Sequence, residues 1–347
     1  MDHIGQHKRR VRYQGTHPKN FSEKYKELEP EKYGETIEKI IRKGKTPAGM
    51  HISICVDEIL GILQIKPGQT GLDATLGYGG HTLEMLKYLN FSGHLYALDV
   101  DSIELDKTKN RLYQLGYGSD VLTVKQLNFA NIDQAVAADS LDFVLADLGV
   151  SSMQIDNPER GFTYKREGPL DLRLNPEDGD TAANRLKTIS QYELEGLLIE
   201  NADEPYAKEI SRAIVSRIKK GLDITTTTIL REIISEALSF IPAKERKDAV
   251  NKSCQRTFQA LRIEINHEFD VLSMFLEKLP RVLKSGGRVA ILTFHSGEDR
   301  LVKKSFKSLF REGIYSDIAR NVIRASAEEC AGNSRARSAK LRWAVKA

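Results

Sequence analysis

Residues 73–82 read Asp73-Ala74-Thr75-Leu76-Gly77-Tyr78-Gly79-Gly80-His81-Thr82, and this stretch decides the fold. A short apolar run starts at Gly71 just before it, and leucines recur at helical spacing just after it. The pattern predicts a buried strand, a glycine-rich turn and a helix. Such a turn lets the backbone approach a ligand closely and points free amide groups at it. We therefore expect a ligand site at the end of the first strand.

The turn alone leaves three interpretations open. A dinucleotide-binding turn has the pattern G-x-G-x-x-G, and Gly77 and Gly79 fit it, while Thr82 stands in place of the third glycine. Asp73, near the end of the strand, is more typical of loops that hold S-adenosylmethionine. A tight turn that binds no ligand is the third interpretation.

The next predicted strand, 94–99, ends at Asp99, about twenty residues beyond the turn. A carboxylate at the tip of this strand can accept hydrogen bonds from both ribose hydroxyls of an adenosine. The alternative is that Asp99 or Asp101 caps a helix that begins near Ser102. Both roles are compatible, with Asp99 at the ribose and Asp101 at the cap.

The composition is that of an ordinary globular protein, with 347 residues, a net charge of +4, 40% hydrophobic and 29% charged residues. This length predicts one large domain, or one domain with an insertion. No apolar run approaches the roughly 20 residues that cross a bilayer, and no secretory signal is recognisable, so we expect a cytoplasmic protein without a membrane partner. Cys55, Cys254 and Cys330 are far apart, which favours reduced thiols over a disulfide framework or a metal site.

Strands and helices alternate in the first half of the chain, which predicts a parallel sheet covered by helices on both faces. No buried strand is recognisable over 155–252, so this region is interpreted as a helical insertion between the fourth and fifth strands. After it we expect a long helix over 264–283, a stop at 284–287 and a last, antiparallel edge strand over 339–345. The five parallel strands are expected near 71–76, 94–99, 121–125, 141–147 and 288–294.

This pattern divides the chain into three parts: a basic N-terminal arm over 1–49, an α/β domain over 50–154 and 253–347, and the insertion over 155–252. An insertion at the carboxyl ends of the strands overhangs the ligand crevice, so we expect it to shape the substrate pocket. The arm contains the basic cluster Lys8–Arg12, which fits either a phosphate-binding segment or a solvated tail, and a charged helix is expected over Glu31–Lys43.

Ligands of an open parallel sheet bind at the carboxyl ends of its strands, where the strand order reverses. Each candidate there also has a structural alternative: Phe129 fits the core as well as an adenine face, His81 fits a polar residue at a helix start, and Gln154 fits an ordinary loop donor. His295, Ser296 and Asp299 lie too close along one turn for a hydrolase triad, and no nucleophile elbow accompanies them. The rule selects Gly77–His81, Asp99, Asn128–Phe129, Asp147 and His295.

Asp147-Leu148-Gly149-Val150-Ser151-Ser152 follows the fourth predicted strand. Methylation of an exocyclic amine needs hydrogen-bond acceptors at this place, because the amine lone pair is delocalised into the ring. Acceptors that hold the amine hydrogens turn the nitrogen toward the methyl group. A sulfonium is already a good leaving group, so no metal is required, and alignment dominates the rate gain.

The chain resembles the bacterial small-subunit ribosomal-RNA cytosine-N4 methyltransferases, the MraW/RsmH family, from His51 to its end. It departs from the family pattern at Leu172, Asn251–Cys254 and Gly297. The motifs that carry the resemblance, in the family's order, are Asp73–His81, Asp147–Ser152, Arg160–Phe162, Gly168–Asp171, Arg256–Ile263, Phe294–Ser296 with Glu298–Arg300, and Arg335–Ser338.

The resemblance implies a class I, Rossmann-like methyltransferase fold that uses S-adenosylmethionine to methylate the N4 of a cytosine in the decoding region of 16S ribosomal RNA. The base would be splayed out of its RNA context into the crevice. Asp147 and His295 are the candidates at the target amine. Carried over by motif, the donor contacts would be Gly79, Gly80, His81, Asp99, Phe129, Asp147 and Gln154.

The expected partner is 16S ribosomal RNA in the small subunit, and the sequence leaves a homodimer open. A dinucleotide oxidoreductase and a catalytically inactive ribosome-assembly protein are the competing function classes. Five arginines are candidate phosphate or base contacts, or else form ion pairs with Asp171, Glu264 or Asp299; they are Arg160, Arg173, Arg256, Arg262 and Arg300.

Overall fold

The structure is a computed structural model that describes residues 53–347. The predicted basic arm over 1–49, with its Lys8–Arg12 cluster and its expected helix over Glu31–Lys43, lies outside the described residues.

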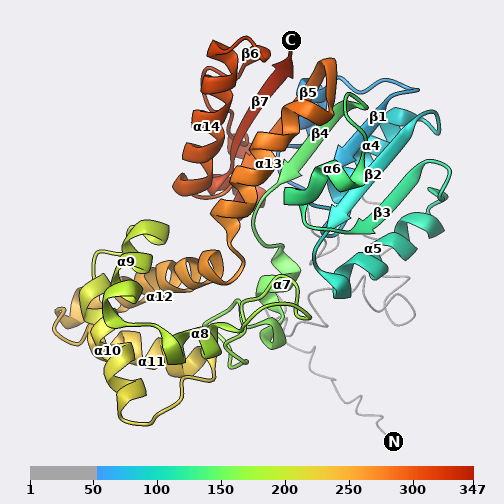
Figure 1. The fold of residues 1–347 in the computed structure, drawn as a ribbon. Coiled ribbons are helices and arrows are strands. Elements are labelled where there is room, and N and C mark those ends of the chain that lie inside the picture. Colours follow the sequence, from blue (N-terminus) through green and yellow to red (C-terminus); the bar gives the residue numbers. More distant parts are fainter. Residues whose placement is uncertain (1–52) are drawn as a thin grey trace, which may run out of the picture. The chain divides into compact units, whose positions relative to one another are not determined.

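The described residues form one seven-stranded sheet in the order β3-β2-β1-β4-β5-β7-β6 (Figure 1). β1 to β5 pair in parallel, β7 is antiparallel to β5, and β6 is antiparallel to β7. The chain moves outward from β1 to β3 and then returns to β4, so the order reverses between β1 and β4. The mostly parallel sheet is thereby confirmed. The strands are β1 Thr70–Asp73, β2 His94–Asp99, β3 Leu122–Gln126, β4 Leu141–Asp147, β5 Leu283–Thr293, β6 Tyr315–Ile318 and β7 Lys340–Lys346.

Helices bury both faces of the sheet. On β4, Phe143 and Leu145 face one hydrophobic cluster while Val144 and Ala146 face another. The first cluster holds residues of α3 (Val56–Leu63), α4 (Gly80–Leu89) and α5 (Ser102–Gln114); the second holds residues of α6 (Ile132–Ala135), α13 (Glu268–Val282) and α14 (Ser296–Arg311). Because neither face meets water, the strand reads as a nearly continuous apolar run.

The helical region has a hydrophobic core of its own, which includes Leu194, Ile210, Leu230 and Leu261. Figure 1 shows α8 to α12 grouped together. The described residues of 155–252 contain no strand, and the predicted boundary at 252 falls within α12. The helices of this region are α7 Ser152–Asp156, α8 Ala182–Thr188, α9 Gln191–Ala202, α10 Ala207–Lys219, α11 Thr227–Ala237 and α12 Ala243–Ile265, with a 3₁₀ turn at Pro158–Arg160.

Three local predictions need correction. The helix expected over 264–283 is found as α13, but residues 264–265 still belong to α12, and the two helices are separated where His267 adopts a positive φ of 49°. The stop at 284–287 belongs to β5, which starts at Leu283 and continues through a register shift that Gly286 permits with its φ of 76°. β7 is antiparallel as expected but is not the edge, because β6 pairs with its outer side. The remaining short helix is α15 Ala327–Gly332.

None of the described helices combines the length and the apolar composition that crossing a bilayer would require.

Candidate functional site

The glycine turn between β1 and α4 brings the backbone close to neighbouring groups. Gly77 and Gly79 have positive φ values of 47° and 70°, which L side chains rarely adopt. A Cβ at Gly80 would lie 2.1 Å from the Ser53 hydroxyl oxygen. The turn therefore requires glycine at these places.

The buried carboxylate of Asp73 holds this turn in place through hydrogen bonds. Its carboxylate is 1% exposed and accepts hydrogen bonds from the Thr82 hydroxyl at 2.6 Å and the Thr75 amide at 3.1 Å. Burial raises the pKa of Asp73, while these hydrogen bonds oppose that shift. Asp73 thus ties the end of β1 to the first turn of α4.

Asp99 ends β2 beside the glycine turn, as the sequence predicts. Its Oδ2 accepts the Gly77 amide at 2.6 Å and its Oδ1 accepts the Asp101 amide at 2.9 Å. Burial raises the pKa of Asp99 to about 6, although the two amides oppose the shift. A carboxylate offers about four acceptor positions, so Asp99 keeps capacity for two further donors such as ribose hydroxyls.

Asp101 anchors a closed network next to Asp99. It caps α5 as predicted, since its Oδ1 accepts the amides of Ile103 and Glu104. Its Oδ2 accepts Gln154 Nε2 at 2.7 Å and Arg160 Nη1 at 2.7 Å. Asp101 and Arg160 are 1% and 7% exposed. Every acceptor position of this carboxylate is therefore in use.

Gln154, a predicted donor contact, has two structural partners. Besides Asp101, its side-chain oxygen accepts the Ser151 amide at 2.8 Å and completes a capping box at the start of α7. Its role toward the donor stays a prediction.

His81 and Asp147 meet across the strand ends. His81 Nδ1 lies 3.4 Å from Asp147 Oδ2, and His81 Nε2 lies 3.0 Å from the Ile54 carbonyl oxygen. Burial raises the pKa of Asp147 to about 6; His81 opposes this shift, and the neighbouring carboxylates Asp73 and Glu298 add to it. Asp147 Oδ1 is buried and has no hydrogen-bond partner.

His295 lies at the carboxyl end of the neighbouring strand, β5. Its Nε2 is 3.3 Å from Glu298 Oε1, too poorly placed for a hydrogen bond, and its ring centroid is 5.7 Å from that of Phe269. Burial raises the pKa of Glu298, but His295 and Arg262 outweigh it and lower that pKa overall. Among the described residues seven buried side-chain N or O atoms have no hydrogen-bond partner, and three of them belong to Asp147 and His295.

Phe129 follows β3 and lies partly in the core. Its ring packs edge-on against Phe275, with centroids 5.2 Å apart. The core interpretation is therefore confirmed for part of the ring, and its contact with an adenine stays a prediction.

The candidate RNA-binding arginines divide into two groups. Arg173 pairs with Asp171, one of the partners that the sequence allowed. Arg160 and Arg262 also form ion pairs, but with Asp101 and Glu268 instead of the expected carboxylates, and Asp299 pairs with Arg342. Arg256 and Arg300 form no ion pair with any described residue.

The sequence analysis did not predict the roles of two residues in this site, Asp101 and Glu298. Asp101 was expected only as a cap, although it also holds Gln154 and Arg160, which lie 53 and 59 positions away. Glu298 follows His295 by three residues in the first turn of α14, a spacing that places two side chains side by side. That spacing was the available signal for Glu298.

The sheet order and the antiparallel β7, with a glycine turn after β1 and carboxylates at the ends of β2 and β4, define a Rossmann-like fold of the class I methyltransferase type. The chain belongs to the MraW methylase family, which matches residues 48–347.

Curated relatives cover almost the whole chain. The chain is 70% identical to "Ribosomal RNA small subunit methyltransferase H 1" of Lachnoclostridium phytofermentans, over 98% of this chain and 93% of that protein. It is also 70% identical to "Ribosomal RNA small subunit methyltransferase H 2" of Alkaliphilus metalliredigens, over 100% and 99% of the two chains. A solved putative rRNA-methylase from Clostridium thermocellum matches at 13% identity and a TM-score of 0.40, over 86% and 98% of the two chains.

Proposed function

We propose that this protein transfers a methyl group from S-adenosylmethionine to the N4 amine of a cytosine in the decoding region of 16S ribosomal RNA. Membership of the MraW methylase family and the names of the curated relatives support a methyltransferase of the small ribosomal subunit. We infer that it acts in the cytoplasm, where its ribosomal RNA substrate is found. The finer assignment to one amine rests on the chemistry of the strand ends.

The residues present fit the donor. The positive φ values at Gly77 and Gly79 keep the turn open to a ligand, and the room beside Gly80 is too small for a side chain. Gly79, Gly80 and His81 would hold the methionine part, and Asp99 would accept the ribose hydroxyls with its two remaining acceptor positions. When bound, the donor supplies an electrophilic methyl group on a sulfonium.

The unpaired Asp147 Oδ1 is the observation that carries the assignment to an amine. A buried acceptor without a partner destabilises the folded protein. A ligand that donates a hydrogen bond to this acceptor removes that cost, which favours binding of the ligand. A cytosine amine has two N–H groups, and His295 offers a second acceptor on the next strand. Acceptors rather than donors are what an amine requires.

Asp147 then aligns the reacting nitrogen. Holding one N–H turns the amine out of conjugation, so its lone pair points at the methyl carbon. The C–N bond forms as the S–C bond breaks, and the amine then releases one proton through an acceptor at the site. The products are N4-methylcytosine, S-adenosylhomocysteine and a proton, and alignment supplies most of the acceleration.

The helical region would receive the RNA. The Asp101–Arg160 contact ties the loop that enters this region to the strand that carries Asp99. A cytosine must leave its stack to reach Asp147, because pairing and stacking shield its amine. We infer that the region over 155–252 covers the splayed base.

The direct test is methyl transfer to small subunits that lack the mark. With labelled donor, we expect one methyl group per subunit, and mass mapping of the RNA should find it as N4-methylcytosine. Bound donor without product would contradict catalysis, and a methyl group on another atom would contradict the role of Asp147.

A further inference from the structure

Helix α14 carries a stripe of four cations opposite its buried side. Arg300, Lys304, Lys307 and Arg311 recur at i, i+4, i+7 and i+11, the spacing of one helix face. All four are exposed, whereas the residues of α14 that are buried are Glu298, Val302 and Phe306. We call these four residues the α14 stripe.

The charge of the α14 stripe is not compensated by the fold. No described residue forms an ion pair with any of its four members. The carboxylates at the start of the same helix are engaged elsewhere, Glu298 beside His295 and Asp299 with Arg342. Glu312, just beyond the helix, accepts the Ser308 hydroxyl at 2.8 Å.

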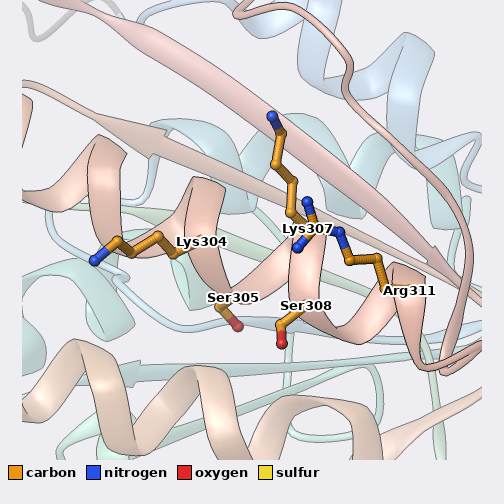
Figure 2. A pocket seen from close by; sticks show the side chains of 5 residues that line it. All are labelled: Lys304, Ser305, Lys307, Ser308 and Arg311. Atoms are coloured by element: carbon orange, nitrogen blue, oxygen red, sulfur yellow. The ribbon is translucent and has the colours of Figure 1, made fainter.

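A surface hollow of about 540 Å³ lies along the distal part of the stripe (Figure 2). Ammonium and guanidinium groups donate hydrogen bonds and accept none, and the Ser305 hydroxyl can donate as well. Such a lining suits the oxygens of a phosphodiester, and its positive charge disfavours a cation. The hollow is lined by Lys304, Ser305, Lys307, Ser308 and Arg311.

The stripe leads away from the candidate active site. α14 begins at Ser296, directly after His295. With a rise of about 1.5 Å per residue, Arg300 lies roughly 6 Å and Arg311 roughly 22 Å along the axis from that start. A nucleic-acid strand with one base drawn to Asp147 must continue outward from the strand ends, and this helix offers it a positively charged path.

We propose that the α14 stripe binds the phosphate backbone of the ribosomal RNA on one side of the target cytosine. This inference rests on the proposed function, because it takes RNA as the substrate. Phosphate contacts of this kind position the RNA and carry no base specificity. The stripe therefore sets affinity for the subunit and leaves the chemistry at Asp147 unchanged.

The test neutralises the distal stripe in the full chain with Lys304→Gln, Lys307→Gln and Arg311→Gln combined. Each lost phosphate contact makes the slope of log Kobs against log salt shallower by about 0.7 for single strands, so we expect a slope shallower by about 2 and binding to unmethylated subunits about 100-fold weaker at 0.1 M salt. KM for subunits should rise correspondingly, while kcat at saturation and binding of S-adenosylhomocysteine should stay at the wild-type values.

A matched control removes the same charge elsewhere, with Lys66→Gln, Lys87→Gln and Arg281→Gln combined. These residues precede β1, lie in the last turn of α4 and lie in the last turn of α13, so none of them belongs to α14. Lys87 forms a solvent-accessible ion pair with Glu84, and such a pair contributes little to stability. The control should keep the wild-type slope.

Three outcomes would overturn the inference. Either an unchanged slope in the stripe variant or an equal change in both variants would exclude a role for this face. Weaker binding to intact subunits, with unchanged binding to a naked RNA fragment of the decoding region, would assign the stripe to an acidic protein surface. A separate result, that the wild-type protein methylates no RNA, would contradict the proposed function itself.

Discussion

Two buried polar clusters lie at the carboxyl edge of the sheet, one after β2 and one at the ends of β4 and β5, and they differ in one respect. Around Asp101 every acceptor position is filled, by two amides, Gln154 and Arg160. Around Asp147 and His295, three buried polar atoms have no hydrogen-bond partner. A carboxylate at or just beyond a strand end has all its acceptor positions filled in one cluster and an unpaired oxygen in the other. The difference separates a cluster that holds the fold from one that awaits a ligand.

Breaking the closed cluster should have the largest effect on stability. Arg160→Met would leave the buried Asp101 carboxylate without its cationic partner, which costs about 3–5 kcal/mol of unfolding free energy. Urea titration at pH 7.5 measures it.

Arg173→Met is the matched control, because Arg173 pairs with Asp171 in a more accessible place, at 19% and 20% exposure. We expect it to cost about 1 kcal/mol or less. Equal costs for the two variants would remove the distinction between a buried and an accessible pair.

Substitutions in the cluster of Asp147 and His295 should affect activity more than stability. Asp147→Asn replaces the acceptor with a group that also donates, so we expect kcat to fall about 10²–10³-fold, as for loss of one preorganised polar contact in a transition state. Because Asp147 is also an expected donor contact, the Kd for S-adenosylhomocysteine, measured by calorimetry, should rise, but by a much smaller factor than kcat falls.

Asp142→Asn is the control on the same strand. Asp142 lies at the opposite end of β4, where it accepts the Thr70 amide and pairs with Lys284. A similar loss of kcat in both variants would show that Asp147 acts only through the stability of the strand.

The raised pKa of Asp147 determines how the stability of the protein should change with pH. Burial raises this pKa from 3.8 to about 6, so the folded state binds the proton more readily than the unfolded state. The stabilising effect of protonation is complete below pH 3.8 and is lost as pH rises through about 6.

Asp147→Asn should therefore raise the unfolding free energy by about 1–3 kcal/mol at pH 8, with no gain near pH 4, since one pKa unit corresponds to about 1.4 kcal/mol. Thermal or urea unfolding across this pH range checks this expectation. A variant that is less stable than wild type at pH 8 would contradict the burial cost.

In the wild-type protein, kcat/KM should fall below pH 6, because Asp147 and Asp99 both become protonated there.

Glu298 should show the smallest effect. It keeps an anion 3.3 Å from His295 and accepts the Phe294 amide at 3.1 Å, so we expect it to position the His295 ring. Glu298→Gln should lower kcat about tenfold, an effect of about 1.4 kcal/mol, because the ring loses the charge beside it.

The pH profile distinguishes positioning from simple destabilisation. If Glu298 governs His295, the variant should shift the pH dependence of kcat while leaving KM for the donor unchanged. A rise in KM with an unaltered profile would assign Glu298 a structural role only.

The sequence was sufficient for features that local pattern controls. Asp99 and Asp147 were found because each follows an apolar run that neighbouring helices bury on both faces. β6 was missed because only its first and last residues, Tyr315 and Ile318, are buried, so it has no strand period to recognise. β5 was truncated because a double glycine usually stops an element, whereas here it forms an irregularity within the strand.

Contacts between distant segments could not be found in this way. Arg160 meets Asp101 across 59 positions, and Arg262 meets Glu268 across the break between α12 and α13. Which carboxylate an arginine pairs with depends on how helices and loops pack, and no local pattern records it. For the same reason, the sequence alone could not show that Asp147 Oδ1 has no hydrogen-bond partner.

The most direct measurement is a crystal structure of the protein with S-adenosylhomocysteine and cytidine. We predict that the cytidine amine nitrogen lies within about 3.2 Å of Asp147 Oδ1, with the Asp101 cluster unchanged. A structure in which the amine lies away from both Asp147 and His295, while Oδ1 bonds to a protein group, would contradict the account.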